Sequence, residues 1–204
     1  MKRLSVEDAI VTAGAVDLSV EPRFPVRSGR LSTVYCDLRR LLAHPREREI
    51  VADALAEEIA DVPAGYDTLA ATASGAIAWG ALAAAHSHLQ KPLVYVTAEP
   101  KKHGSQSRIH GDLPANHRVA LIEDVVNRGG SAARAVEILR DEGAARVHDV
   151  FAIVRYPHSP ELDRLDPVVQ LRTLVGIEAL VRLAADRQEL SRRQLADVLA
   201  GLDA

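Results

Sequence analysis

The feature that most constrains the fold is an alternation of short apolar strands with helical segments between residues 67 and 154. Continuous apolar runs or apolar side chains at helical spacing identify each segment. The predicted strands cover residues 67–73, 93–96, 119–122 and 147–154, and the predicted helices cover residues 76–89 and 131–142, the second ending at Gly143. Strands joined by helices form parallel sheets with helices on their faces, so this stretch predicts an α/β fold.

The segments outside this alternation are shorter or more mixed. Residues 24–36 alternate polar and apolar side chains around a Ser-Gly pair, as a β-hairpin does. Residues 45–60 open with proline and acidic residues and carry apolar side chains at helical spacing, which predicts a helix. Residues 1–22 are expected to be helical in part. After Pro157 we expect a short strand at residues 168–171 and then two helices.

Length and composition narrow the class of protein. A chain of 204 residues suits a single domain and is long enough to bury a core. Aromatic residues make up only 3% of the chain, so this core is built largely from Val, Leu, Ile and Ala. Such a core suits parallel strands covered by helices.

Charge and cysteine content exclude several classes of function. The formal net charge of −3 gives no reason to expect nucleic-acid binding. Cys36 is the single cysteine, which excludes an internal disulfide framework and a Cys-rich metal site. The chain shows no signal-peptide pattern and no apolar run long enough to span a bilayer, so we expect a cytoplasmic protein without a membrane partner.

Residues 100–118 form a long polar segment without periodicity between two predicted core strands. Loops of this length in compact domains are usually functional or disordered. One interpretation is a tolerated surface insertion. The other is a lid that closes over an anion with its cationic side chains, which are Lys101, Lys102, His103, Arg108 and His110.

The strongest chemical signal follows directly, in residues 119–131 (VALIEDVVNRGGS). Two adjacent carboxylates, Glu123 and Asp124, stand at the end of an apolar strand, where they can accept hydrogen bonds from vicinal sugar hydroxyls. The turn Gly129-Gly130-Ser131 opens a helix and exposes backbone N–H groups, which favours phosphate binding. A plain helix start preceded by acidic residues is the alternative, and the carboxylate pair at a buried strand end argues against it. The pattern predicts a site for a ribose and its 5′-phosphate.

Several segments resemble a known family. Residues 123–131 resemble the phosphoribosyl pyrophosphate (PRPP) signature of type I phosphoribosyltransferases, in which two acidic residues precede a Thr-Thr-Gly-Gly-Ser-like loop. Residues 26–32 (VRSGRLS) resemble the Leu-Lys-Ser-Gly-Arg-x-Ser hood segment of the orotate branch. Residues 94–104 (VYVTAEPKKHG) resemble its lid, Tyr-Val-Arg-Lys-Glu-x-Lys-x-His-Gly, and residues 150–155 its next strand, which ends in an arginine that contacts orotate. The lid and hood matches indicate the orotate branch, whereas the PRPP loop indicates only the superfamily.

The resemblance implies a type I phosphoribosyltransferase fold, with a twisted, mainly parallel sheet flanked by helices and a small N-terminal hood. It divides the expected single domain into hood elements at about 1–45, a core at about 60–156, and a C-terminal strand and helices at 157–204. It implies Mg²⁺-dependent transfer of the 5-phosphoribosyl group from PRPP to orotate, which gives orotidine 5′-phosphate and pyrophosphate in pyrimidine nucleotide biosynthesis. It also implies a homodimer with shared active sites.

The resemblance assigns roles to individual residues. Glu123 and Asp124 would bind the ribose hydroxyls, and Lys101 and His103 would close on the pyrophosphate in the neighbouring subunit's site. Lys101, His103 and Asp124 are therefore the expected catalytic residues, and no protein metal ligand is expected. The remaining substrate-binding positions are Val125, Val126, Asn127, Arg128, Gly129, Gly130 and Ser131 at the 5′-phosphate, Ser74 and Gly75 in the pyrophosphate loop at 72–76, and Arg27, Tyr35 and Arg155 at the base. Arg155 as a solvated charge and Tyr35 as an ordinary strand aromatic are the alternatives.

The chain departs from the family pattern near the pyrophosphate. Thr97-Ala98 replaces the Arg-Lys pair of the lid, Gly75 stands where some members carry lysine, and Asn127-Arg128 replaces two small residues. Either Arg128 compensates for the missing cations, or the protein has another acceptor base or weak activity. A third alternative is a non-catalytic PRPP-binding regulatory domain. Such a domain would need no lid, and the retained residues 101–104 (KKHG) argue against it.

Overall fold

The structure is a computed structural model of the chain, and it describes residues 4–25, 31–100, 107–158, 160–165 and 169–202. The chain divides into two compact units. The first unit joins Met1–Val51 to Val175–Ala204, and the second comprises Ala52–Leu174. The organisation as one domain with a hood stays a prediction.

The second unit is built on a six-stranded sheet in the order β10-β9-β8-β5-β6-β7. Strand β8 pairs in parallel with β5 and β9, and β5 pairs in parallel with β6, whereas β7 runs antiparallel to β6. The strands are β5 (Thr68–Thr72), β6 (Leu93–Val96), β7 (Ile109–His110), β8 (Arg118–Val126), β9 (Arg146–Arg155) and β10 (Gln170–Gly176). The predicted α/β fold with a mainly parallel sheet is confirmed.

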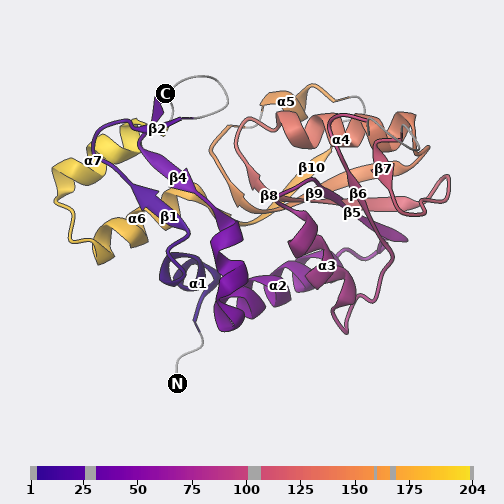
Figure 1. Cartoon of the computed structure of the whole chain (residues 1–204), viewed down its shortest axis with the longest axis horizontal. Coiled ribbons are helices and arrows are strands. Elements are labelled where there is room, and N and C mark those ends of the chain that lie inside the picture. The colour runs from indigo at the N-terminus through magenta and orange to yellow at the C-terminus, as the bar shows by residue number, and fades with distance from the viewer. Residues whose placement is uncertain (1–3, 26–30, 101–106, 159, 166–168, 203–204) are drawn as a thin grey trace. The chain divides into compact units, whose positions relative to one another are not determined.

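Helices cover both faces of this sheet, with α4 (Gly130–Asp141) on one face and α3 (Ile77–Ala85) on the other (Figure 1). Apolar side chains recur along α4 at helical spacing, and the side chains of Val136 and Leu139 are fully buried against the sheet. Val119 and Leu121 of β8 belong to the same cluster, and burial of each such side chain contributes about 1.5–3 kcal/mol. The central strands are apolar on both faces because both faces are covered.

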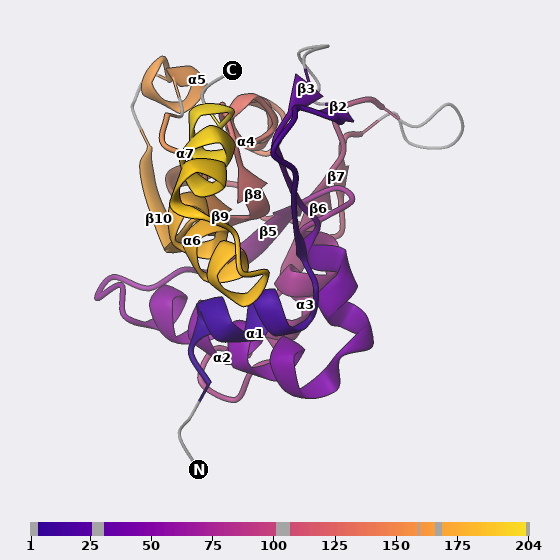
Figure 2. The same cartoon turned by 90° about the vertical axis from the view of Figure 1, so that its left-hand side faces the viewer.

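The first unit brings N-terminal and C-terminal elements together. Helix α6 packs on α1 and on β1 in this unit (Figure 2). The Thr33 hydroxyl donates to the Val198 carbonyl at 2.7 Å, and Arg187 donates to Asp8 at 2.6 Å. The elements are α1 (Val6–Thr12), β1 (Val16–Leu18), β2 (Phe24–Pro25), β3 (Leu31–Ser32), β4 (Val34–Cys36), the 3-10 helix η1 (Leu38–Ala43), α6 (Ile177–Arg187) and α7 (Arg192–Ala200). Helix α2 (Pro45–Ala60) starts in the first unit and ends in the second, and the one-turn helix α5 (Pro160–Asp163) belongs to the second.

The predicted elements are largely present. Helix α2 and strand β6 have the predicted bounds, the hairpin pairs Phe24 with Ser32, and two helices follow β10. The hairpin turn at 26–30 lies outside the described residues. None of the described helices combines the length and the apolar character needed to cross a membrane.

Three predicted boundaries are wrong. Strand β8 continues past Ile122 to Val126 because β9 extends beside it, pairing Val154 with Val125. The helix expected at 76–89 ends at Ala85. The strand expected at 168–171 corresponds to β10, which covers Gln170–Gly176. The segment 100–118 contains β7, whose two residues pair with the end of β6.

Candidate active site

The predicted ribose and phosphate positions lie along the carboxyl edge of the sheet in the second unit. Parallel pairing puts Ala71 of β5 opposite Ile122 of β8, so the next residues, Thr72 and Glu123, are neighbours at this edge. Val126 lies opposite Arg155 at the end of β9. Because parallel strands end at the same edge, the loops that follow β5 and β8 meet there.

The loop between β8 and α4 has the geometry of an anion cradle. Gly129 precedes the helix with a φ of +86°, in the left-handed region that glycine adopts without steric conflict. A Cβ at Gly129 would lie 2.9 Å from Cγ of Leu162 in α5, so α5 also requires a residue without a side chain. No side chain caps the N-terminus of α4. The first N–H groups of the helix are therefore available to a phosphate, which the helix dipole also attracts.

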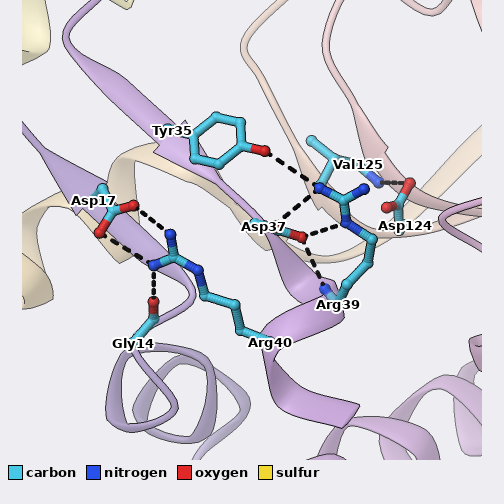
Figure 3. A network of polar contacts seen from close by, with 8 residues as sticks. All are labelled: Gly14, Asp17, Tyr35, Asp37, Arg39, Arg40, Asp124 and Val125. Carbon is cyan, nitrogen blue, oxygen red and sulfur yellow. Dashed lines mark hydrogen bonds and ion pairs between the residues drawn. The ribbon is translucent and has the colours of Figure 1, made fainter. Parts of the chain in front are cut away.

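Asp124 lies against the loop that follows β5. Its carboxylate is half-buried, and Oδ1 accepts a hydrogen bond from the Val125 N–H at 2.9 Å (Figure 3). A Cβ on Gly75 would lie 2.2 Å from Oδ2 of Asp124. Ser74, the neighbour of Gly75, is exposed, and the Ala73–Ser74 peptide bond is cis. The predicted ribose carboxylate and the predicted pyrophosphate loop are thus in direct contact.

Glu123 is more deeply buried than Asp124. It is only 4% exposed. The Thr72 hydroxyl donates to one of its carboxylate oxygens, and the Ser131 hydroxyl donates to the other at 2.6 Å. Adjacent strand residues point to opposite faces, so Glu123 and Asp124 cannot share one environment within β8. The sequence placed Thr72 at the start of the predicted pyrophosphate loop and did not predict its contact with Glu123.

The two ends of the predicted lid segment are held by polar contacts within the second unit. The Thr97 N–H donates to the Arg108 carbonyl at 2.9 Å, and the Thr97 hydroxyl donates to the Glu99 carbonyl at 2.8 Å. Arg108 donates to the Glu142 carboxylate at 2.6 Å, and this side-chain hydrogen bond lowers the pKa of Glu142. The predicted catalytic residues Lys101 and His103 lie outside the described residues.

Two arginines stand near these loops. Arg128 in the phosphate loop is 66% exposed at its side chain, and its guanidinium lies 4.0 Å from Glu161 of α5. Arg134, one helical turn into α4, donates to the Ala98 carbonyl at 3.3 Å and approaches Glu99 at 3.9 Å. Asn127, like Arg128, is exposed. The sequence identified Arg128 as a candidate cation and did not identify Arg134.

The predicted base-binding residues are spread over both units. Arg155 is exposed at the end of β9 in the second unit. Tyr35 lies in β4 of the first unit, where its ring stacks on Phe24 with centroids 5.9 Å apart. Its hydroxyl accepts a hydrogen bond from Arg39 at 3.3 Å, and Arg39 also binds Asp37, which lowers the pKa of Asp37 (Figure 3). Arg27 lies outside the described residues.

The described part of the chain holds no cluster of three or more His, Cys, Asp or Glu side chains suited to a metal ion. A cation that brings most of its oxygen ligands with a phosphorylated substrate needs no such cluster.

Comparisons with known proteins match most of the chain. Residues 37–185 match the model of the phosphoribosyl transferase domain. The chain is 33% identical over 190 residues to orotate phosphoribosyltransferase of Cutibacterium acnes, covering 93% of this chain and 87% of that protein. It is 32% identical over 192 residues to orotate phosphoribosyltransferase of Listeria innocua, covering 94% and 90%. The crystal structure of orotate phosphoribosyltransferase from Aeropyrum pernix has a TM-score of 0.72 at 29% identity, covering 91% of this chain and 99% of that chain.

These matches include the sheet, the loop after β5 and the loop that opens α4. They confirm the predicted type I fold, and the similarity extends beyond the PRPP loop over nearly the full length of the two relatives. The chain belongs to the phosphoribosyltransferase family, in its orotate phosphoribosyltransferase branch.

Proposed function

We propose that the protein transfers the 5-phosphoribosyl group from PRPP to orotate, giving orotidine 5′-phosphate and pyrophosphate in pyrimidine nucleotide biosynthesis. The observation that carries this proposal is the contact between Asp124 and the loop at Gly75, beside the uncapped N-terminus of α4. A ribose carrying phosphates at both ends fits that arrangement, with a carboxylate between two phosphate-binding loops. The similarity to curated orotate phosphoribosyltransferases supports the choice of acceptor.

In this proposal the chain's own residues bind and orient PRPP. Asp124 accepts hydrogen bonds from ribose hydroxyls, and the backbone N–H groups from Asn127 to Ser131 hold the 5′-phosphate, with Val125 and Val126 leading into that loop. The loop with Ser74 and Gly75 holds the pyrophosphate. Breaking the bond from C1 to pyrophosphate develops positive charge on the ribose and negative charge on the leaving group, and the anionic base then attacks C1. No covalent enzyme nucleophile is required.

The magnesium ion is part of this proposal. When bound, Mg²⁺ neutralises charge on pyrophosphate and ribose oxygens. Asp124, which lies against the pyrophosphate loop, would contact the waters of such an ion. Mg²⁺ prefers a few carboxylate oxygens together with phosphates and water.

The lid, the dimer and the location remain proposals that rest on the resemblance. Lys101 and His103 close on the pyrophosphate from the neighbouring subunit, so a homodimer with shared active sites is the working unit. Arg27, Tyr35 and Arg155 hold the base, and the enzyme works in the cytoplasm. Closure of the lid excludes water, which would otherwise hydrolyse PRPP.

The second candidate is a phosphoribosyltransferase with another acceptor base. It is raised by the residues at positions 97, 98 and 75, where Thr97, Ala98 and Gly75 stand in place of the cations expected near the pyrophosphate. The test is a panel of bases incubated with PRPP and Mg²⁺, with pyrophosphate release followed for each base. We expect orotate to be consumed and uracil, which lacks the carboxylate, to be a poorer acceptor. Release with another base and none with orotate would establish the alternative.

A further inference from the structure

We propose that Glu161 of α5 sets the affinity of the phosphate loop, because it is the counter-ion that Arg128 leaves when a phosphate binds. The phosphate loop is the segment 127–131, which the proposed function assigns to the 5′-phosphate of PRPP. The inference rests on that proposed function. It adds a carboxylate that competes with the substrate for a cation of this loop.

Helix α5 is joined to the phosphate loop by contacts that involve no charge. The Glu161 N–H donates to the Arg128 carbonyl at 3.2 Å. Leu162 is only 2% exposed, and a Cβ at Gly129 would lie 2.9 Å from its Cγ. Helix α5 accordingly lies beside α4 in the second unit (Figure 1). These contacts hold the backbone of Glu161 next to the loop.

The Glu161 carboxylate has two guanidinium groups near it, at different distances. Arg164, which directly follows α5, donates from Nη1 to Oε2 at 2.9 Å. Nη2 of Arg128 lies 4.0 Å from Oε1, which is beyond hydrogen-bond length, so this second contact is electrostatic alone. Arg164 therefore neutralises most of the Glu161 charge, and Arg128 can leave without stranding an unpaired carboxylate.

A phosphate is a better partner for Arg128 than Glu161 is. A phosphate monoester carries roughly −1.5 to −2 charges near pH 7 and offers several acceptor oxygens to a guanidinium. An exposed ion pair contributes little to stability, and the Arg128 side chain is 66% exposed, so giving up the contact at 4.0 Å costs little. One loop carries both Arg128 and the N–H groups assigned to the phosphate, so the exchange needs only a rotation of the side chain.

The exchange fixes the sign of the expected effect. The contact with Glu161 stabilises the substrate-free protein and is lost on binding, so it lowers the affinity for a phosphate ligand. Removing the Glu161 charge should therefore raise that affinity. Damage to the loop or to its packing on α5 would lower it. A gain of affinity thus separates the exchange from a merely structural role of Glu161.

The experiment measures binding of ribose 5-phosphate, and of PRPP with Mg²⁺, to the full chain by titration calorimetry, with thermal unfolding to check each variant. We expect Glu161→Gln to bind ribose 5-phosphate about two- to fivefold more tightly, the range that an exposed ion pair allows, and PRPP to change in the same direction. At about 1 M salt, where the Debye length is about 3 Å, most of this gain should disappear.

Two further variants separate the exchange from a general effect of charge. Asp163→Asn is the matched control, because it removes one negative charge from an exposed residue of the same helix. Its affinity for ribose 5-phosphate should stay within about 1.5-fold of the wild type. Arg128→Gln should weaken binding, and Glu161→Gln should add little on the Arg128→Gln background, because the cation for which Glu161 competes is gone.

Three results would overturn the inference. The first is a Glu161→Gln variant that binds ribose 5-phosphate no more tightly than Asp163→Asn does. The second is weaker binding in Glu161→Gln, which would assign Glu161 a structural or ligating role. The third is a gain that persists in full on the Arg128→Gln background, which would indicate simple repulsion between Glu161 and the phosphate. A folded wild type that binds neither ligand would instead refute the proposed function, and the inference with it.

Discussion

Gly75→Ala offers a test of the site that removes none of the predicted ligating side chains. Gly75 has no left-handed backbone conformation, so alanine meets no backbone penalty at this position. The new Cβ, however, would lie 2.2 Å from Oδ2 and 2.6 Å from Cγ of Asp124. Ordinary contacts begin at about 3.5 Å, so the carboxylate must move by roughly 1 Å or more. That movement breaks the hydrogen bond from the Val125 N–H, which is 2.9 Å long.

The expected loss can be worked out from this displacement. If Asp124 accepts hydrogen bonds from the ribose, moving it by that distance removes charge-assisted bonds worth about 1.5–3 kcal/mol. This free energy corresponds to a roughly 10- to 150-fold rise in the Kd for PRPP. Asp124→Ala should show a loss of similar size. On the Asp124→Ala background, Gly75→Ala should add little, because the side chain that it displaces is already gone.

Calorimetric titration of PRPP with Mg²⁺ measures these affinities, and thermal unfolding checks that each variant folds. Gly176→Ala is the matched control, because a Cβ there meets no atom within 4 Å and the position lies in the first unit. It should bind PRPP like the wild type. Wild-type affinity in Gly75→Ala, or losses that add in the double variant, would refute the assignment of Asp124 as the ribose carboxylate held against this loop.

Further predictions concern the lid, the phosphate loop, the stability of the fold at acid pH and the role of Arg128. Lys101→Ala should lower kcat on the order of 10²-fold with less effect on PRPP affinity, and mixing it with Asp124→Ala subunits should restore part of the activity if lids serve neighbouring sites. Gly129→Ala combines a left-handed φ with a steric clash and should lower the melting temperature by roughly 4–8 °C. The pKa of Glu142 is lowered from its ordinary value of 4.5, so the folded protein binds its proton less readily than the unfolded chain. That stabilisation is present above about pH 4.5 and is lost as the pH falls through the lowered pKa, so melting curves of Glu142→Gln should depend less on pH in this range. Arg128→Thr should abolish most of the orotate turnover, as measured by pyrophosphate release.

Much of the fold could be predicted from local pattern. Helix α2 and strand β6 have the predicted bounds because their apolar spacing and flanking residues agree with their tertiary environment. The end of β8 could not be predicted in the same way. Glu123 and Asp124 are charged, and two charged residues after an apolar run predict the end of a strand. The strand nevertheless continues to Val126, because β9 pairs with it over these residues. A partner strand is a property of the tertiary structure and leaves no mark in the local sequence.

The candidate site was predictable in its positions and not in its contacts. The carboxylate pair and the Gly-rich turn indicated a ribose and a phosphate from residue types alone. The hydrogen bond from Thr72 to Glu123 and the contact of Gly75 with Asp124 join positions that are about fifty residues apart. Only the register of β5 on β8 brings them together. The same holds for the first unit, where Thr33 binds the carbonyl of Val198.

The absence of the expected cations has a structural reason that favours compensation over loss. A lysine at Gly75 would collide with Asp124, and an arginine at Thr97 would give up the hydroxyl that binds the Glu99 carbonyl. These positions are therefore adapted to small residues, and changing them to cations would break existing contacts. Arg128 and Arg134 stand instead on the loop and helix that follow β8, with guanidinium groups well exposed to solvent. An exposed arginine beside a polyanion can contribute a few kcal/mol to stabilising developing charge. On this reasoning Arg128→Thr is severe, whereas the double change Thr97→Arg with Ala98→Lys brings no gain. A gain of about tenfold from the double change, with little loss in Arg128→Thr, would show that the enzyme has been weakened and that Arg128 does not compensate.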